Sequence, residues 1–143
     1  MKIVIGADHA GVELKERLRV FLTELGHEVE DLGTNGPDSV DYADFAHPVA
    51  KAVSDGDAPR GLLVCGTGQG MAMAANRHQG VRAAVCRDLF EAKMTRAHND
   101  ANILCIGARV IGEGVAEELV RLFMEIEFEG GRHARRVDKI AGD

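Results

Sequence analysis

The feature that most constrains this chain is an alternation of short apolar runs with helical patterns, repeated five times along the sequence. Such alternation predicts right-handed crossovers and a parallel sheet with helices on both faces. We therefore expect an α/β fold, a three-layer α/β/α Rossmann-like sandwich with a five-stranded parallel sheet. The predicted strands are residues 3–5, 27–32, 62–65, 81–85 and 103–106.

The third predicted strand, residues 62–65, is the most continuously apolar, which favours the centre of the sheet. Gly26 is typical of a helix end, and Asp88 with Glu91 is typical of a helix start. A last helix is expected from Arg132. Helical spacing of apolar residues also covers residues 14–25, 45–53 and 115–126.

Length, charge and cysteine usage narrow the function classes. A chain of 143 residues can bury a full core, and its evenly spaced turns predict one domain over residues 1–143. The net charge of −6 disfavours a nucleic-acid partner, and no apolar run reaches the roughly 18 residues of a membrane span. The N-terminal apolar stretch is short for a signal peptide, and three separated cysteines predict no disulfide framework. We expect a cytoplasmic protein without a membrane partner.

Ligands of open parallel sheets bind outside the carboxyl ends of the strands. The richest segment there is residues 65–70, Cys-Gly-Thr-Gly-Gln-Gly, whose backbone N–H groups can converge on a phosphate or an oxyanion. It is neither a P-loop nor a dinucleotide fingerprint. A plain tight turn between strand and helix is the alternative interpretation.

Cys65 adds weight to the functional interpretation of this loop. A thiol at a strand end that faces a helix N-terminus is expected to have a lowered pKa, and its thiolate can act as a nucleophile or a base. The alternative is a small buried apolar side chain, the role that we assign to Cys86 and Cys105.

Three further groups could carry chemistry. Asp8 and His9 follow the first strand, where the alternative is a capping aspartate beside an exposed histidine. His98 lies between the fourth helix and the fifth strand, a turn that belongs at the amino ends of the strands, away from the expected ligand site. Either that helix ends early and the chain returns to the site, or His98 serves a neighbouring subunit. Arg132 and Arg136 are four residues apart, and two guanidinium groups on one helix face suit a phosphate dianion. The alternative for this pair is a solvated face of a terminal helix.

Taken together, the motifs resemble the RpiB/LacAB sugar-phosphate isomerase family, which includes ribose-5-phosphate isomerase B. Each motif alone is weak, whereas the ordered set across nearly the entire chain is specific. The matching motifs are residues 6–11 (GADHAG), Asp41-Tyr42, residues 65–70 (CGTGQG), 74–76 (AAN), 98–102 (HNDAN), 107–110 (GARV), and 129–133 (EGGRH) with Arg136.

The resemblance implies an aldose–ketose isomerase that interconverts ribose 5-phosphate and ribulose 5-phosphate, or a related sugar phosphate, through a cis-enediolate, with no metal and no cofactor. Cys65 matches the base that moves a proton between C1 and C2. Other members use a glutamate at the position of Met71. His98 matches the residue that opens the sugar ring, and Asp8 and Thr67 complete the implied catalytic set.

The resemblance also implies the substrate contacts. The backbone of residues 66–70 matches an anion hole for the enediolate, and His9, Arg132 and Arg136 match phosphate contacts. The family's pockets lie between two subunits, which implies a homodimer with shared active sites, or a tetramer. The implied substrate-binding set is Asp8, His9, Gly66, Thr67, Gly68, Gln69, Gly70, Asn99, Arg109, Arg132 and Arg136.

Two positions depart from the family pattern. Ala43 stands where many relatives have proline, and Gln69 where a small apolar residue is common. Both border the pocket, so the sugar stays open among four-, five- and six-carbon phosphates. A non-catalytic sugar-phosphate-binding subunit of a hetero-oligomer is the second hypothesis. A nucleotide-binding or redox module ranks last, because the sequence has no CxxC and no dinucleotide loop.

Overall fold

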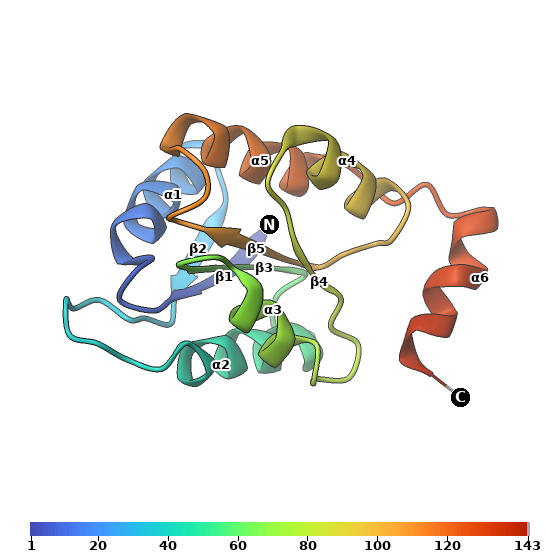
Figure 1. The fold of residues 1–143 in the computed structure, drawn as a ribbon. Helices are drawn as coiled ribbons and strands as arrows, with labels where there is room; N and C mark the ends of the chain where they lie inside the picture. Colours follow the sequence, from blue (N-terminus) through green and yellow to red (C-terminus); the bar gives the residue numbers. More distant parts are fainter. Residues whose placement is uncertain (143) are drawn as a thin grey trace.

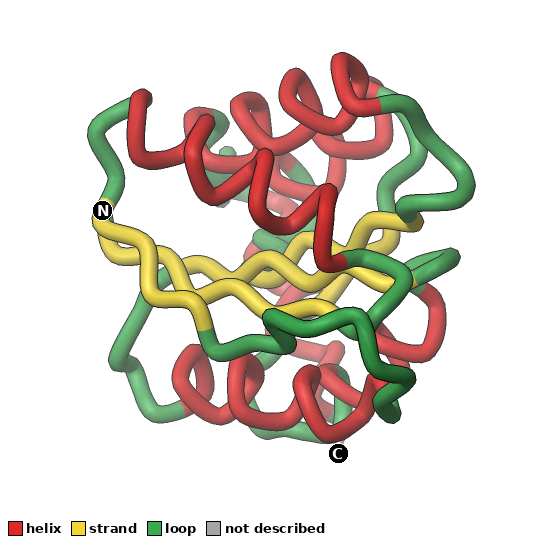
Figure 2. The backbone as a smooth tube through the Cα atoms, turned by 90° about the vertical axis from the view of Figure 1, so that its left-hand side faces the viewer, coloured by secondary structure: helices red, strands yellow, loops and turns green. Residues whose placement is uncertain are grey.

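Within residues 1–142, which the computed structural model describes, five parallel strands form one sheet in the order β2-β1-β3-β5-β4. The strands are β1 (Lys2–Ala7), β2 (Glu28–Asp31), β3 (Arg60–Cys65), β4 (Ala83–Val85) and β5 (Ile103–Gly107). The helices are α1 (Val12–Glu24), α2 (Tyr42–Ser54), α3 (Gln69–Ala75), α4 (Leu89–Ala97), α5 (Glu113–Glu125), α6 (Arg132–Asp138) and the 3-10 helix η1 (Lys139–Ala141). Helical layers lie above and below the sheet (Figure 1, Figure 2), which confirms the predicted three-layer α/β/α sandwich.

The two faces of the sheet bury opposite sides of each central strand. In β3, Leu62 and Val64 belong to the core under α1, α4 and α5, whereas Leu63 and Cys65 belong to the core against α2 and α3. Burial on both faces explains the continuous apolar run that the sequence shows there. Because β3 is the central strand, as predicted, Cys65 lies at the middle of the end of the sheet where the carboxyl ends of the strands meet.

The helix signals of the sequence are confirmed. Gly26 follows α1 with a φ of +95°, a backbone region that favours glycine. Asp88 is the N-cap of α4, and its Oδ1 accepts a hydrogen bond of 2.8 Å from the Glu91 N–H. None of the helices in the described residues combines the length and apolarity needed to cross a membrane.

The fourth strand is shorter than the sequence predicts, since β4 begins at Ala83 rather than at residue 81. The Val81 N–H donates to the carbonyl of His78 in a turn, and the Arg82 N–H donates to Asn102 Oδ1 at 2.7 Å. A side chain thus replaces the first ladder bond at this edge of the sheet.

Candidate active site

The carboxyl ends of β1 and β3 adjoin at the centre of the sheet and bring Asp8 close to Cys65. The Asp8 N–H donates to the carbonyl of Val64 at 3.2 Å, so the chain leaving β1 stays against the end of β3. A Cβ on Gly11 would lie 2.4 Å from the same carbonyl oxygen, and glycine is therefore required for α1 to start here. This is the switch point at which open α/β sheets bind ligands.

The glycine loop after β3 curls around the Cys65 sulfur. Gly68 has a φ of +82°, and its N–H donates to Cys65 Sγ at 3.1 Å. The loop also lies directly on the end of β5, since a Cβ on Gly107 would be 2.8 Å from the Thr67 backbone. Cys65 itself is 5% exposed. An N–H donor aimed at a sulfur stabilises negative charge on it.

Polar groups of the predicted set surround this loop. The Arg109 N–H donates to the Gly66 carbonyl at 3.0 Å, and the Arg109 guanidinium lies across Gly66. Thr67 Oγ1 accepts the Gln69 N–H at 3.3 Å, and both side chains lie in the exposed part of the loop. The structure therefore brings Cys65, Thr67, Gln69 and Arg109 together at one edge of the sheet.

Asp8 and His9 complete this first cluster. Asp8 Oδ1 accepts the N–H groups of Ala10 at 3.0 Å and Gly11 at 3.3 Å, so the aspartate does cap the turn before α1. His9 Nδ1 accepts the Val40 N–H at 3.2 Å. A neutral His9 must then carry its proton on Nε2, which leaves that N–H free to donate to a ligand.

The loop that orients His9 is held by an ion pair that sequence reasoning missed. Lys15, on α1, is fully buried and donates to both carboxylate oxygens of Asp31, at 2.6 and 2.7 Å, and to Asn35 Oδ1 at 2.7 Å. Asp31 Oδ1 in turn accepts the Gly33 N–H at 2.8 Å. A lysine among polar residues of a helix carries no sequence signal for burial.

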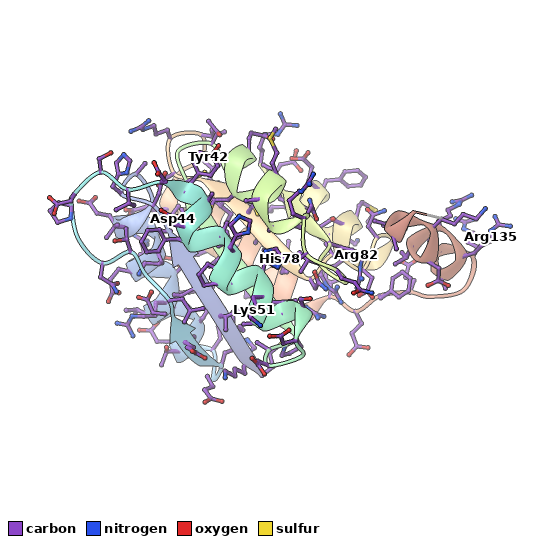
Figure 3. All side chains as sticks on the ribbon, turned by 90° about the horizontal axis from the view of Figure 1, so that it is seen from below. Tyr42, Asp44, Lys51, His78, Arg82 and Arg135 are labelled. Atoms are coloured by element: carbon purple, nitrogen blue, oxygen red, sulfur yellow. The ribbon has the colours of Figure 1, made fainter. Side chains whose placement is uncertain are left out.

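Tyr42 lies beside the glycine loop and is also absent from the predicted site set. Its ring lies against Gly70, where an added Cβ would be 2.3 Å from Cε1. The Tyr42 side chain stands at the start of α2, near α3 (Figure 3). The Asp41-Tyr42 motif was the available signal, although the spacing to residue 70 gives no hint of contact.

The remaining predicted residues form a second cluster at the opposite, amino end of the sheet. Asn102, close to His98 in the chain, accepts the Gly61 N–H at the start of β3. Cys65 lies four residues further along that strand, roughly 13 Å away. The helix α4 continues to Ala97 with His98 as its C-cap, so the chain does not turn back early. One protomer therefore does not bring His98 to Cys65.

This second cluster unites the end of α4 with the start of α6. The Glu129 N–H donates to the Ala97 carbonyl at 3.0 Å, and the His98 and His133 rings stack with centroids 4.2 Å apart. Burial, with the nearby charges of His98 and Arg132, lowers the pKa of His133. Glu129 and His133 belong to a matching motif, but the predicted site omitted them.

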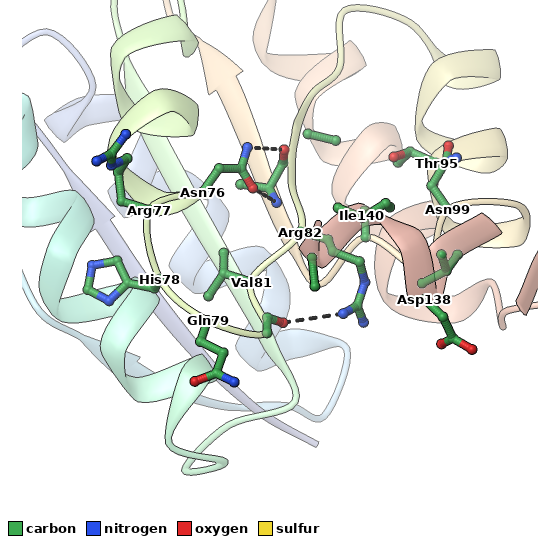
Figure 4. Close-up of a pocket in the computed structure, with 16 residues that line it drawn as sticks. Asn76, Arg77, His78, Gln79, Val81, Arg82, Thr95, Asn99, Asp138 and Ile140 are labelled. Carbon is green, nitrogen blue, oxygen red and sulfur yellow. Dashed lines mark hydrogen bonds between the residues drawn. The ribbon is translucent and has the colours of Figure 1, made fainter. Parts of the chain in front are cut away.

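Arg132 and Arg136 are exposed on α6, which carries them away from the sheet. Figure 1 shows α6 beyond the end of the sheet opposite to the β5 arrowhead. The α6 helix confirms that the two arginines share one helix face, and both are exposed. A cleft of about 900 Å³ separates the far end of α6 from the loop before β4, and Asn99 and Arg82 line it (Figure 4).

Comparison with known proteins decides the family. The model of the ribose/galactose isomerase family matches residues 3–140. The chain belongs to the ribose/galactose isomerase family. Within it, the chain is an isomerase of the ribose-5-phosphate isomerase B type, as the resemblance of its motifs implied.

The family relatives match along almost their whole length. Ribose-5-phosphate isomerase B of Escherichia coli is 43% identical over 97% of this chain and 93% of its own. D-erythrulose-4-phosphate isomerase of Pectobacterium atrosepticum is 41% identical over 98% and 93%. The ribose-5-phosphate isomerase B structure from Clostridium thermocellum has a TM-score of 0.97 and 52% identity over 99% and 95%. That from Mycoplasma genitalium, with bound ribulose-5-phosphate, has a TM-score of 0.94 and 42% identity over 98% and 93%.

Proposed function

We propose that this chain interconverts ribose 5-phosphate and ribulose 5-phosphate through a cis-enediolate, with Cys65 as the base. The observation that carries the proposal is the Cys65 sulfur seated 3.1 Å from the Gly68 amide inside the glycine loop. The reaction named for the Escherichia coli relative and the ribulose-5-phosphate bound in the Mycoplasma genitalium structure support this substrate.

The chemistry that the loop can perform is proton transfer next to a carbonyl. The Cys65 thiolate takes the proton from C2 of the open-chain aldose, and the electrons move onto the carbonyl oxygen to give the enediolate. The hydroxyl proton then passes from O2 to O1, the C2–O2 bond becomes the carbonyl, and the same sulfur returns its proton to C1, which yields the ketose. The Gly68 N–H is held by the sulfur, and the other backbone N–H groups of residues 66–70 line the turn where the oxyanion develops. Such preorganised donors supply much of the stabilisation in this class of reaction.

Ring opening requires a second group, and we assign it to His98 of a second copy of the chain. Within one protomer, His98 and Cys65 lie at opposite ends of the sheet, farther apart than a five-carbon sugar phosphate extends. The α6 helix stands away from its own sheet, which lets Arg132 and Arg136 reach over a neighbour. The proposed assembly is a homodimer with shared active sites, or a tetramer built from such pairs.

The open edge of the sheet at β4 is the face that fits this neighbour. Met73 of α3 and Phe90 of α4 flank that edge and are 70% and 71% exposed. Exposed apolar side chains of this size mark surfaces that bind other proteins. The cleft between β4 and α6 would receive the carboxyl ends of the partner's strands, so that Asn99 joins the shared site.

Phosphate recognition is assigned to both clusters. Arg132 and Arg136 offer two guanidinium groups from one helix face, and His9 offers the Nε2–H that its contact with Val40 leaves free. A phosphate group that is held at the far end of the sugar orients C1 and C2 toward the sulfur of Cys65. Asp8 and Arg109 are proposed to hold the sugar hydroxyl groups between these ends.

The test is to incubate the purified chain with ribose 5-phosphate and follow the formation of ribulose 5-phosphate. Turnover supports the proposal, and absence of turnover on every aldose or ketose phosphate tried would leave the non-catalytic subunit. Four- and six-carbon sugar phosphates belong in the same assay, because the Pectobacterium relative is named for a four-carbon substrate. The three cysteines of the chain are free, which suits the reducing cytoplasm that the sequence predicts.

A further inference from the structure

Three side chains at the root of α6 converge on one point. His98 Nε2 and His133 Nε2 each lie 3.6 Å from the same oxygen of Glu129, Oε1. One ligand atom of each residue, a ring nitrogen or a carboxylate oxygen, lies within 4.8 Å of the other two. The chain between Glu129 and His133 passes through Gly130 and Gly131, with φ of +67° and +55°, and this turn brings the carboxylate back toward both rings.

We propose that His98, Glu129 and His133 form a binding site for a divalent transition-metal cation of the Zn²⁺ class. Zn²⁺ takes imidazole nitrogen and carboxylate oxygen at about 2.0–2.2 Å, and two histidines with one glutamate are a known donor set for it. Tetrahedral bonds of that length place neighbouring ligand atoms roughly 3.4 Å apart, close to the two observed distances of 3.6 Å. Imidazole nitrogen disfavours Mg²⁺ and Ca²⁺, which prefer oxygen ligands.

The two rings must rotate for both nitrogens to point at one ion. They now stack with an angle of 11° between their planes, so an ion between them would lie outside each ring plane. In the described residues neither ring makes another side-chain hydrogen bond that would resist this rotation, and the His98 side chain is 37% exposed. The buried His133 would move least, and His98 would turn toward it.

Occupancy of this site would remove His98 from catalysis. This second part rests on the proposed function, because Nε2 of His98 is the atom that we assign to ring opening. An ion that binds this nitrogen occupies its lone pair and blocks proton transfer there. The site would thus make the isomerase reversibly sensitive to free Zn²⁺, an inhibitor in a proposed mechanism that routes no step through a metal.

The binding experiment uses Co²⁺ alone, added to the full-length chain without sugar, and records the visible absorption of the ion. We expect the intense bands of a four-coordinate nitrogen and oxygen site, without a sulfur charge-transfer band. Glu129→Gln keeps the shape of an exposed side chain, and it should weaken binding about tenfold or more. His133→Gln is the second variant, checked for folding by its thermal transition.

The matched control is His47→Gln, because His47 and His78 form another close histidine pair, with Nδ1 and Nε2 2.8 Å apart. His47→Gln should leave Co²⁺ binding unchanged. Loss of binding in His47→Gln, a sulfur band that disappears in Cys65→Ser, or no binding at all would each overturn the proposed site. Inhibition of turnover by Zn²⁺ is measured separately, so a failure of the proposed function leaves the binding result intact.

Discussion

The sulfur of Cys65 accepts a hydrogen bond of 3.1 Å from the N–H of Gly68, the left-handed residue at which the glycine loop becomes α3. Both groups are buried, so water competes little for this contact. The hydrogen bond fixes the sulfur against the loop whose other amides line the proposed oxyanion position. The conformation of the loop therefore fixes both the position of the Cys65 sulfur and the position of the amides proposed to bind the oxyanion.

Cys65→Ser should abolish turnover and keep substrate binding. A serine hydroxyl is too weak an acid to supply the base, so we expect kcat to fall about a thousandfold or more, while the affinity for ribose 5-phosphate changes little. Steady-state kinetics and calorimetric binding measure the two effects. Cys86→Ala, which removes a buried thiol outside the site, should keep wild-type kcat. Near-normal turnover of Cys65→Ser would identify another residue as the base.

Arg136→Ala should raise the KM for a phosphorylated sugar about tenfold or more, because it removes one guanidinium group from the phosphate site. The matched control is Arg135→Ala, since Arg135 is the exposed neighbour whose side chain points away from the body (Figure 3). KM for ribose 5-phosphate is measured in both variants, with unphosphorylated ribose as the comparison substrate. Equal losses in the two variants, or on ribose, would contradict the phosphate role.

Lys15→Met should destabilise the fold by about 3 kcal/mol, because it leaves the Asp31 carboxylate without its buried partner. Urea unfolding measures the change in free energy. Lys2→Met is the control, since Lys2 pairs with Glu30 at the surface, where water screens the attraction, and its loss should change the free energy of unfolding far less. Similar losses of unfolding free energy in the two variants would show that the buried Lys15–Asp31 pair stabilises the fold no more than a surface ion pair does.

Only Cys65 should react with iodoacetamide at pH 8 in the native chain, against three thiols in denaturant. Burial raises the pKa of Cys86 to about 12 and also raises the pKa of Cys105. Because an unfolded thiol ionises near pH 8.5, Cys86 and Cys105 stay protonated to a higher pH in the native state than in the unfolded state. The free energy of unfolding should therefore fall as the pH rises above about 9. Mass spectrometry locates the label, and modification of Cys86 at pH 8 would refute this assignment.

Most of the fold could be predicted from the sequence because its signals are local. The apolar runs and the caps at Gly26 and Asp88 each depend on a few neighbouring residues. The start of β4 could not be predicted, since it depends on the side chain of Asn102, 20 residues away from Arg82. Strand ends that depend on such distant contacts leave no periodic signal.

The candidate site divides in the same way. Cys65 and the glycine loop were predicted from their place at the end of a central strand, and the structure surrounds them with Asp8 and Arg109. Lys15 and Tyr42 were missed because their roles depend on burial and on contact between separate segments. The sequence allows two alternatives for His98, an early end of the fourth helix or a role in a neighbouring subunit. The length of α4 excludes the early helix end.

The most direct test of a site built from two chains mixes Cys65→Ser with His98→Asn after each has been shown to be inactive alone. The two variants are unfolded together, refolded and assayed with ribose 5-phosphate. In a random mixture half of the pairs are mixed, and each mixed pair has one intact site of two, so activity should return to about one quarter of wild type. Activity that stays at the level of the separate variants, in a mixture shown to contain mixed pairs, would contradict the shared site.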